Sequence, residues 1–218
     1  KIFLFEPNSV LGRANKFMLK ICKKIICYYT DVKLLPKKFN EKIYIINPIL
    51  RKKIYLFKKN NKKEFNDIKK ILIIGGSQGA EFFDKNLSEV VIKVSKKLKL
   101  EVHQQIFDNN NQISIKEKYS KLGIKSRLFN FDETLFENLN EFDLVITRSG
   151  ASAISEISFL NIPFFAIPFP KARDNHQYFN AKFYENKNCC WLIKQNEFDI
   201  DSLSNKLVEV FNEKADYL

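Results

Sequence analysis

From residue 71 onward, short runs rich in apolar and β-branched residues alternate with longer segments of helical periodicity. Strands are expected at residues 71–74, 101–107, 126–129, 143–147, 163–168 and 189–193. Helices are expected at residues 80–97, 112–121, 134–138, 151–160, 175–186 and 201–212. Nearly continuous apolar strands joined by helices form parallel sheets covered on both faces. The pattern therefore predicts an α/β fold with a doubly wound, Rossmann-like parallel sheet, whose ligand lies at the carboxyl ends of the strands.

The region before residue 71 has a different pattern. Apolar residues recur at helical spacing between Leu11 and Ile25, with basic residues between them, which predicts a basic amphipathic helix. Two strand-like runs follow at residues 25–29 and 43–46, and the second ends at Asn47-Pro48. We therefore expect a domain boundary after Pro48, with residues 1–48 ending one domain and residues 49–218 forming another. The lysine-rich stretch at residues 58–63 fits a linker or a solvated loop.

Composition excludes several classes of protein. The 218 residues are 45% hydrophobic and 28% charged, which is typical of a globular chain rather than a disordered one. No apolar run approaches the roughly 20 residues that span a bilayer. The four cysteines lack C-x-x-C spacing, and Cys189 and Cys190 lie in an apolar run, which indicates buried thiols of a reducing compartment. Together with only two histidines, this argues against a metal site.

Positive charge is concentrated near the start of the chain. Residues 1–70 contain 19 basic and 5 acidic side chains, within a whole-chain net charge of +12. One interpretation is adhesion to an anionic membrane surface, and the other is a solvated surface shaped by biased genome composition. Nucleic acid is not the expected partner, because the sequence shows no zinc-finger, helix-turn-helix or RNP-like pattern.

A glycine-rich turn, Gly75-Gly76-Ser77-Gln78-Gly79-Ala80, follows the strand at 71–74 and opens a helix. Such a turn presents backbone N–H groups and a helix N-terminus to an anion. It matches neither the Walker A loop nor the G-x-G-x-x-G spacing. A tight strand-to-helix turn that binds nothing is the alternative.

Two further polar motifs follow later strands. Arg148-Ser149-Gly150-Ala151 follows the strand at 143–147, and Glu156 lies on the next helix, where a carboxylate can accept ribose hydroxyls. Asp174-Asn175-His176-Gln177 opens the helix at 175–186, and the amides of Gln177 and Asn180 are spaced to face one polyhydroxyl ligand. Taken singly, Glu156 fits a solvated glutamate near the start of a helix better than a ligand contact, and the alternative for His176 is a surface histidine. The three motifs converge because carboxyl ends of parallel strands share one edge of the sheet.

Together these residues resemble the MurG family of UDP-N-acetylglucosamine transferases. The resemblance includes the three motifs, the segment Glu6-Pro7-Asn8 with its following Gly12 and Asn15, and Asn47-Pro48-Ile49-Leu50-Arg51. It implies a GT-B fold with a complete C-terminal domain and the end of an N-terminal domain. The chain opens with Lys1 and a strand, so we expect its true start to lie upstream, with the family's proposed general base.

The resemblance also implies roles for individual residues. Gly76, Ser77, Gln78 and Gly79 would meet the diphosphate, Glu156 the ribose, and His176 with Gln177 the GlcNAc hydroxyls. Phe131 lies where the family brings backbone to the uracil, Arg51 where an arginine reaches the nucleotide, and Asn8 where the other domain approaches the sugar. Ser149, Gly150 and Asn180 complete the expected set of donor-binding residues.

The function implied is inverting transfer of GlcNAc from UDP-GlcNAc to a polyprenyl-diphosphate-linked MurNAc-pentapeptide, with no cofactor or metal. The expected location is peripheral, at the cytoplasmic face of the bacterial inner membrane. A fragment without the base is expected to be inactive alone. The alternative is a UDP-sugar-binding relative or subunit with another lipid acceptor, such as a glycolipid synthase.

Overall fold

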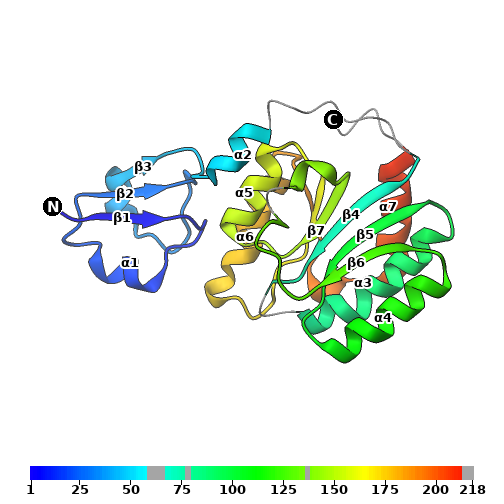
Figure 1. Cartoon of the computed structure of the whole chain (residues 1–218). Coiled ribbons are helices and arrows are strands. Elements are labelled where there is room, and N and C mark those ends of the chain that lie inside the picture. The colour runs from blue at the N-terminus through cyan, green and yellow to red at the C-terminus, as the bar shows by residue number, and fades with distance from the viewer. Residues whose placement is uncertain (58–66, 77–79, 136–137, 213–218) are drawn as a thin grey trace.

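The computed structural model describes residues 1–57, 67–76, 80–135 and 138–212. A small and a large α/β domain lie side by side, each built on a parallel sheet (Figure 1). The expected linker or loop at residues 58–63 and the turn residues Ser77, Gln78 and Gly79 lie outside the described residues.

The small domain has three strands in the order β1-β2-β3. They are β1 (Phe3–Glu6), β2 (Lys24–Cys27) and β3 (Ile43–Ile45), with helix α1 (Arg13–Met18) between the first two. One face of the sheet packs into a core that includes Leu4, Ile25 and Tyr29. The carboxyl end of β1 leads into a loop that contacts the large domain.

The large domain has six strands in the order β6-β5-β4-β7-β8-β9, all parallel. Its strands are β4 (Lys69–Ile74), β5 (Leu100–Gln105), β6 (Lys125–Phe129), β7 (Leu144–Thr147), β8 (Phe164–Ala166) and β9 (Trp191–Leu192). Its main helices are α3 (Ala80–Ser95), α4 (Asn109–Lys121), α5 (Ala151–Phe159), α6 (His176–Glu185) and α7 (Ile200–Asn212). The chain order starts at the centre, moves to one edge and then to the other. The predicted doubly wound fold is therefore confirmed.

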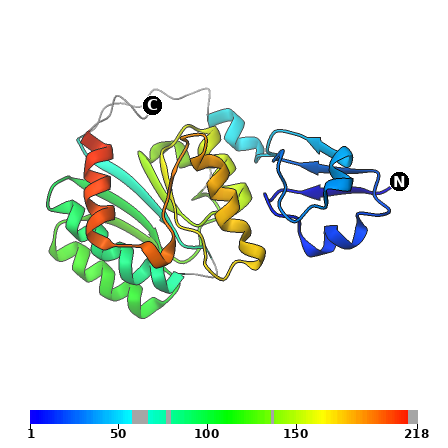
Figure 2. The ribbon, with the colours of Figure 1, turned by 180° about the vertical axis from the view of Figure 1, so that it is seen from behind.

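Helices cover both faces of the larger sheet (Figures 1 and 2). Alternate residues of β4 divide between two cores: Ile71 and Ile73 pack with α3, α4 and α7, while Leu72 and Ile74 pack with α5 and α6. This double burial explains why β4 is apolar at consecutive positions. The strand order reverses between β4 and β7, and such reversal points are where doubly wound sheets bind ligands.

A short helix, α2 (Lys52–Phe57), follows the Pro48 segment and was not expected from the sequence. Leu50 and Ile54 are buried in the core of the large domain, and Tyr55 contacts Phe159 of α5 edge to face. The connection between the domains is therefore anchored to the larger one. The boundary after Pro48 stays a prediction.

Three expectations differ from the structure. The basic helix expected at residues 11–25 is limited to α1, because Ile25 belongs to a buried strand and Phe17 is 88% exposed. The described part of residues 134–138 is a turn rather than an α-helix. Cys189 is exposed, whereas Cys22, Cys27 and Cys190 are buried. In the described ranges, no helix is both long enough and apolar enough to cross a membrane.

Candidate functional site

A cavity of about 350 Å³ lies at the carboxyl ends of the central strands, where the strand order reverses. It brings together Gly76, Gly150 and Gln177 from the three sequence motifs, with Phe131 from the loop after β6. The complete lining is Ile74, Gly75, Gly76, Gln105, Phe129, Phe131, Asp132, Leu135, Thr147, Arg148, Gly150, Ala153, Phe169 and Gln177. The expected convergence of the motifs is therefore observed for these residues.

Gly75 and Gly76, the first residues of the glycine turn, line the cavity. Gly76 has φ +65°, a left-handed conformation that side chains adopt only with strain. Its backbone N–H donates to the Gln105 Oε1 at 3.1 Å, and the Gln105 Nε2 donates to the Asn130 carbonyl at 3.0 Å. Gln105 therefore joins the glycine turn to the loop that carries Phe131. Helix α3 begins at Ala80, so its N-terminus lies immediately beyond the turn.

Arg148, which also lines the cavity, places a positive charge next to the end of β4 and the first turns of α3. Its Nη1 donates to the carbonyls of Ile167 and Pro168 at 3.0 and 3.1 Å, and its guanidinium carbon lies 4.5 Å from the centre of the Phe83 ring. Burial lowers the pKa of Arg148 to about 10, so the group remains cationic at neutral pH. Arg148 belongs to the second sequence motif, but no site role was expected for it from the sequence.

Gln177 ties two loops of the cavity together. Its Oε1 accepts hydrogen bonds from the backbone N–H of Ser149 at 3.3 Å and of Phe169 at 2.9 Å. These loops follow β7 and β8, so one side chain aligns neighbouring strand ends. Ser149 is fully buried, and its Oγ has no hydrogen-bond partner among the described residues.

Glu156 does not line the cavity, although Ala153, one turn earlier on α5, does. The Glu156 side chain is 2% exposed, and its Oε2 lies 3.1 Å from Nη2 of Arg51. The Arg51 backbone N–H also donates to the Glu156 Oε1 at 3.2 Å. Burial raises the pKa of Glu156, while Arg51 opposes that shift. Two predicted nucleotide contacts are thus brought together as an ion pair.

The remaining predicted residues lie at the junction of the two domains or at its border. Asn180 is fully buried, and its side-chain amide forms hydrogen bonds with Ser9, Asn8 and Ser149. Both polar atoms of the Asn180 amide are therefore engaged by protein, and its expected contact with a ligand beside Gln177 stays a prediction. The His176 Nδ1 lies 2.8 Å from the Arg173 carbonyl, so this nitrogen carries the proton. His176 does not line the cavity.

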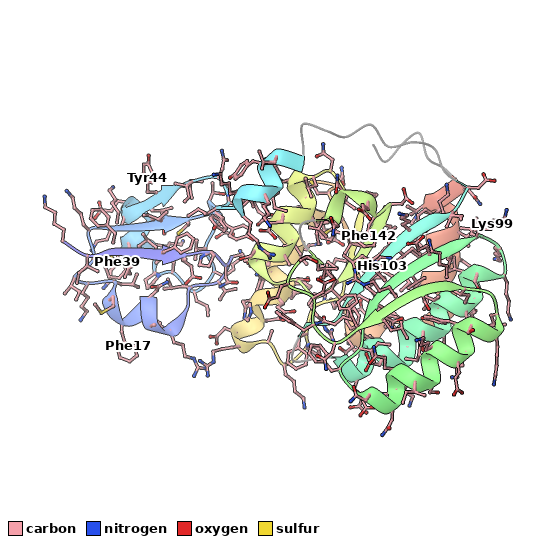
Figure 3. All side chains as sticks on the ribbon, in the orientation of Figure 1. Phe17, Phe39, Tyr44, Lys99, His103 and Phe142 are labelled. Atoms are coloured by element: carbon pink, nitrogen blue, oxygen red, sulfur yellow. The ribbon has the colours of Figure 1, made fainter. Side chains whose placement is uncertain are left out.

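Phe131 lines the cavity and is 74% exposed. The preceding strand and the following turn are joined by an ion pair, with Arg127 Nη2 and Asp132 Oδ2 2.8 Å apart. Elsewhere, His103 and Phe142 meet edge to face with ring centres 4.9 Å apart (Figure 3). His103 therefore contributes to packing and lies outside the cavity lining.

A second cavity, of about 730 Å³, lies at the other end of the sheet. It is lined by Ile162, Pro163 and Cys189, among others, near the amino ends of β8 and β9. None of the predicted site residues contributes to it. Among the described residues, no group of three or more His, Cys, Asp or Glu side chains is arranged to hold a metal ion.

Asp84, on the second turn of α3, is a buried carboxyl group close to the glycine turn. It is 2% exposed, and its Oδ1 has no hydrogen-bond partner among the described residues. Burial raises the pKa of Asp84 to about 6; Asp108 and Glu81 add to the shift, and the Asn111 side chain opposes it. The folded protein therefore holds this proton more tightly than the unfolded chain does.

We expect Asp84→Asn to change how stability depends on pH. In the parent chain, the contribution from protonated Asp84 is complete below the ordinary value of 3.8 and is lost as the pH rises through about 6. The loss amounts to about 3 kcal/mol. The variant should match the parent near pH 4 and be more stable at pH 8, measured by denaturant unfolding. Parallel pH profiles for the two proteins would contradict this.

The sequence model of the glycosyltransferase family 28 C-terminal domain matches residues 70–218, which include every strand around the cavity. The chain belongs to this family. The match places the glycine turn, Arg148, Gln177 and Glu156 within a single glycosyltransferase domain.

Two curated relatives extend the similarity of this family 28 chain to its first domain. Both are named UDP-N-acetylglucosamine--N-acetylmuramyl-(pentapeptide) pyrophosphoryl-undecaprenol N-acetylglucosamine transferase. The Pelagibacter ubique protein is 43% identical over 100% of this chain, and the Rickettsia felis protein is 36% identical over 97%. The chain spans 60% and 61% of their respective lengths.

Solved structures show the same fold. MurG of Acinetobacter baumannii superposes with a TM-score of 0.76 at 20% identity, covering 95% of this chain and 57% of that one. A putative UDP-N-acetylglucosamine 2-epimerase from Listeria monocytogenes superposes with a TM-score of 0.64 at 13% identity, covering 93% and 55%. The family 28 chain therefore has the architecture of GT-B glycosyltransferases.

Proposed function

We propose that the chain forms the donor-binding part of an inverting transferase that moves GlcNAc from UDP-GlcNAc to a lipid-linked MurNAc-pentapeptide. The observation that carries this proposal is the cavity at the strand reversal, which gathers residues of all three motifs in a family 28 domain. The names of the curated relatives support the donor and the acceptor. They favour this function over transfer to another lipid.

In this proposal the cavity binds the nucleotide and stabilises the leaving group. Backbone N–H groups of the glycine turn, the N-terminus of α3 and the cationic Arg148 face the diphosphate, whose negative charge grows as the glycosidic bond breaks. Phe131 borders the uracil, and Gln177 directs its Nε2 toward the sugar. The Glu156 carboxylate is paired with Arg51 and lies outside the cavity lining in this structure, so in this proposal it accepts the ribose hydroxyls once nucleotide binding has opened that pair.

The chemical step is a displacement at the anomeric carbon. A base removes the proton from the acceptor hydroxyl, the resulting oxygen forms a bond to the anomeric carbon, and the bond to UDP breaks with its electrons passing to the diphosphate. We assign the base to the part of the relatives that this chain does not match. The 218-residue chain should therefore bind the donor without turning it over.

Calorimetric titration of the chain with UDP, UDP-GlcNAc and UDP-GalNAc tests the donor assignment. We expect binding of UDP and UDP-GlcNAc, weaker binding of UDP-GalNAc, and the same affinities in EDTA as in Mg²⁺. Uridine serves as the control without phosphate and should bind much more weakly than UDP. Equal affinity for all three nucleotides would contradict the proposal that the site recognises GlcNAc. Failure of a folded chain to bind UDP would contradict the proposal that the cavity binds the donor.

We also propose that the small domain lies against the cytoplasmic face of the bacterial inner membrane. Phe17 and Ile21 are 88% and 62% exposed, and the exposed Lys16, Lys20 and Lys23 surround them in the sequence. Figure 3 shows Phe17 projecting from α1 away from the rest of the protein. An exposed apolar pair among lysines suits a surface of anionic headgroups over acyl chains.

Changing both apolar residues, Phe17→Ser with Ile21→Ser, should weaken binding to vesicles of phosphatidylcholine and phosphatidylglycerol about tenfold, because both side chains lose apolar contact. Co-sedimentation measures the effect. The matched control is Ile113→Ser, which changes a 60% exposed isoleucine of α4 in the other domain and should leave binding unchanged. Equal binding to vesicles of phosphatidylcholine alone would contradict recognition of anionic lipid.

A further inference from the structure

Asn180 of α6 links the two domains through a fully buried amide. Its Oδ1 accepts from the Ser9 backbone N–H at 2.8 Å and from the Ser9 Oγ at 3.0 Å. Its Nδ2 donates to the Asn8 Oδ1 at 3.1 Å and to the Ser149 carbonyl at 3.2 Å. These four bonds use both acceptor positions and both donor hydrogens of one amide.

In the small domain, Glu6 holds the loop that contains Asn8 and Ser9. The Glu6 Oε1 accepts from the Asn8 backbone N–H and from the Asn8 Nδ2, both at 3.2 Å. The Glu6 Oε2 accepts from the Gly12 N–H at 2.6 Å and from the Asn15 Nδ2 at 3.0 Å. The Asn8 side chain is therefore oriented by Glu6 through its nitrogen and by Asn180 through its oxygen.

The large-domain side of the link is part of the cavity wall. The Ser149 carbonyl accepts a hydrogen bond from the Asn180 Nδ2, and the Ser149 N–H donates one to the Gln177 Oε1. The next residue, Gly150, lines the cavity. One amide thus spans from Asn8 of the small domain to the turn after β7.

Other contacts at this junction differ in kind. Phe183, three residues after Asn180 on α6, meets Tyr29 edge to face with ring centres 4.6 Å apart, which supplies apolar packing. Arg13 and Asp174 lie 3.7 Å apart, but the Arg13 side chain is 65% exposed, and such surface pairs contribute little. Asn180 therefore supplies the directional part of the junction, because its hydrogen bonds depend on the relative placement of the two domains.

We propose that Asn180 is a positioning residue that aligns Asn8 with the Ser149–Gly150 turn, so that recognition of the donor's sugar depends on this amide. The sugar-recognition part rests on the proposed function and on the family resemblance, which implies that Asn8 approaches the sugar from the small domain. The UDP part of the donor is bound within the large domain and does not need the alignment. Loss of the link should therefore weaken UDP-GlcNAc binding selectively.

The test uses Asn180→Asp in the full chain. Aspartate keeps the acceptor for Ser9 but places an oxygen opposite the Asn8 Oδ1 and the Ser149 carbonyl, where a donor was. We expect the affinity for UDP-GlcNAc to fall about tenfold while that for UDP stays within about twofold. The matched control is Arg13→Gln, which breaks the exposed junction pair and should change neither affinity. If Asn180→Asp does not fold, Asn180→Ser removes the same donor without a charge.

Interdomain distances measured by electron spin resonance separate this inference from the proposed function. Spin labels at Lys16→Cys and Lys116→Cys, both exposed, report one domain each, in a Cys189→Ser background that removes the exposed thiol. We expect Asn180→Asp to broaden the distance distribution, even if the parent binds no nucleotide. An unchanged distribution, or an equal loss of UDP and UDP-GlcNAc affinity, would overturn the positioning role.

Discussion

Replacing Glu156 with glutamine should lower the affinity for UDP about a hundredfold. A carboxylate that accepts two ribose hydroxyls contributes through two charge-assisted hydrogen bonds, and a neutral amide offers one acceptor in their place. Glu156 is buried and paired with Arg51 in the structure, so its charge is already positioned in a region of low dielectric. Calorimetric titration of parent and Glu156→Gln proteins measures the effect.

The matched probe for this prediction is 2′,3′-dideoxyuridine diphosphate, which lacks both hydroxyls. The parent should bind it far more weakly than UDP, and Glu156→Gln should bind the two nucleotides about equally. If the substitution lowered both affinities by the same factor, Glu156 would act only by holding Arg51. That result would contradict the ribose assignment while leaving the cavity itself in place.

Arg148→Met should lower the affinity for UDP by about thirtyfold or more and leave that for uridine nearly unchanged. Methionine retains much of the volume among Phe82, Phe83 and Phe169 but removes the cation that faces the diphosphate. The carbonyls of Ile167 and Pro168 also lose their donor, so we expect a cost of about 2 to 3 kcal/mol in the free energy of unfolding.

Thermal unfolding shows how much of the Arg148→Met protein is folded at the titration temperature. The loss of stability can therefore be separated from the loss of affinity for UDP. The comparison of UDP with uridine then reports on the phosphates alone. Equal loss of affinity for both ligands would mean that Arg148 supports the shape of the cavity without contributing charge to it.

Periodicity predicted the large domain well because its central strands β4, β7 and β8 are buried on both faces. Runs such as Ile71–Ile74 cannot be mistaken for surface segments, and the helices between them carry one apolar face each. The same reasoning failed between Leu11 and Ile25. There, Phe17 and Ile21 are exposed, α1 has no buried residue, and the helical spacing of apolar residues continues by coincidence from α1 into the buried strand β2. Helix α2, only six residues long, offered too little sequence for a period to show.

The motifs predicted the edge of the sheet where the site lies but not the partners of each side chain. Glu156 pairs with Arg51, which lies 105 positions earlier in the chain. Asn180 forms hydrogen bonds with Ser9 and Asn8, which lie 171 and 172 positions earlier. Local spacing contains no information about such contacts. Gln105 and Arg148 were missed for a related reason, because a lone amide in a strand and a lone arginine in a turn acquire meaning only when neighbouring strand ends are placed beside them.

We expect the cavity between the ends of β4 and β7 to hold the nucleotide, and a crystal structure of the chain with UDP tests this most directly. We expect the diphosphate against Gly75, Gly76 and the N-terminus of α3, the uracil beside Phe131, and the ribose hydroxyls on Glu156. UDP bound in the second cavity, beside Ile162 and Cys189, would contradict the claim.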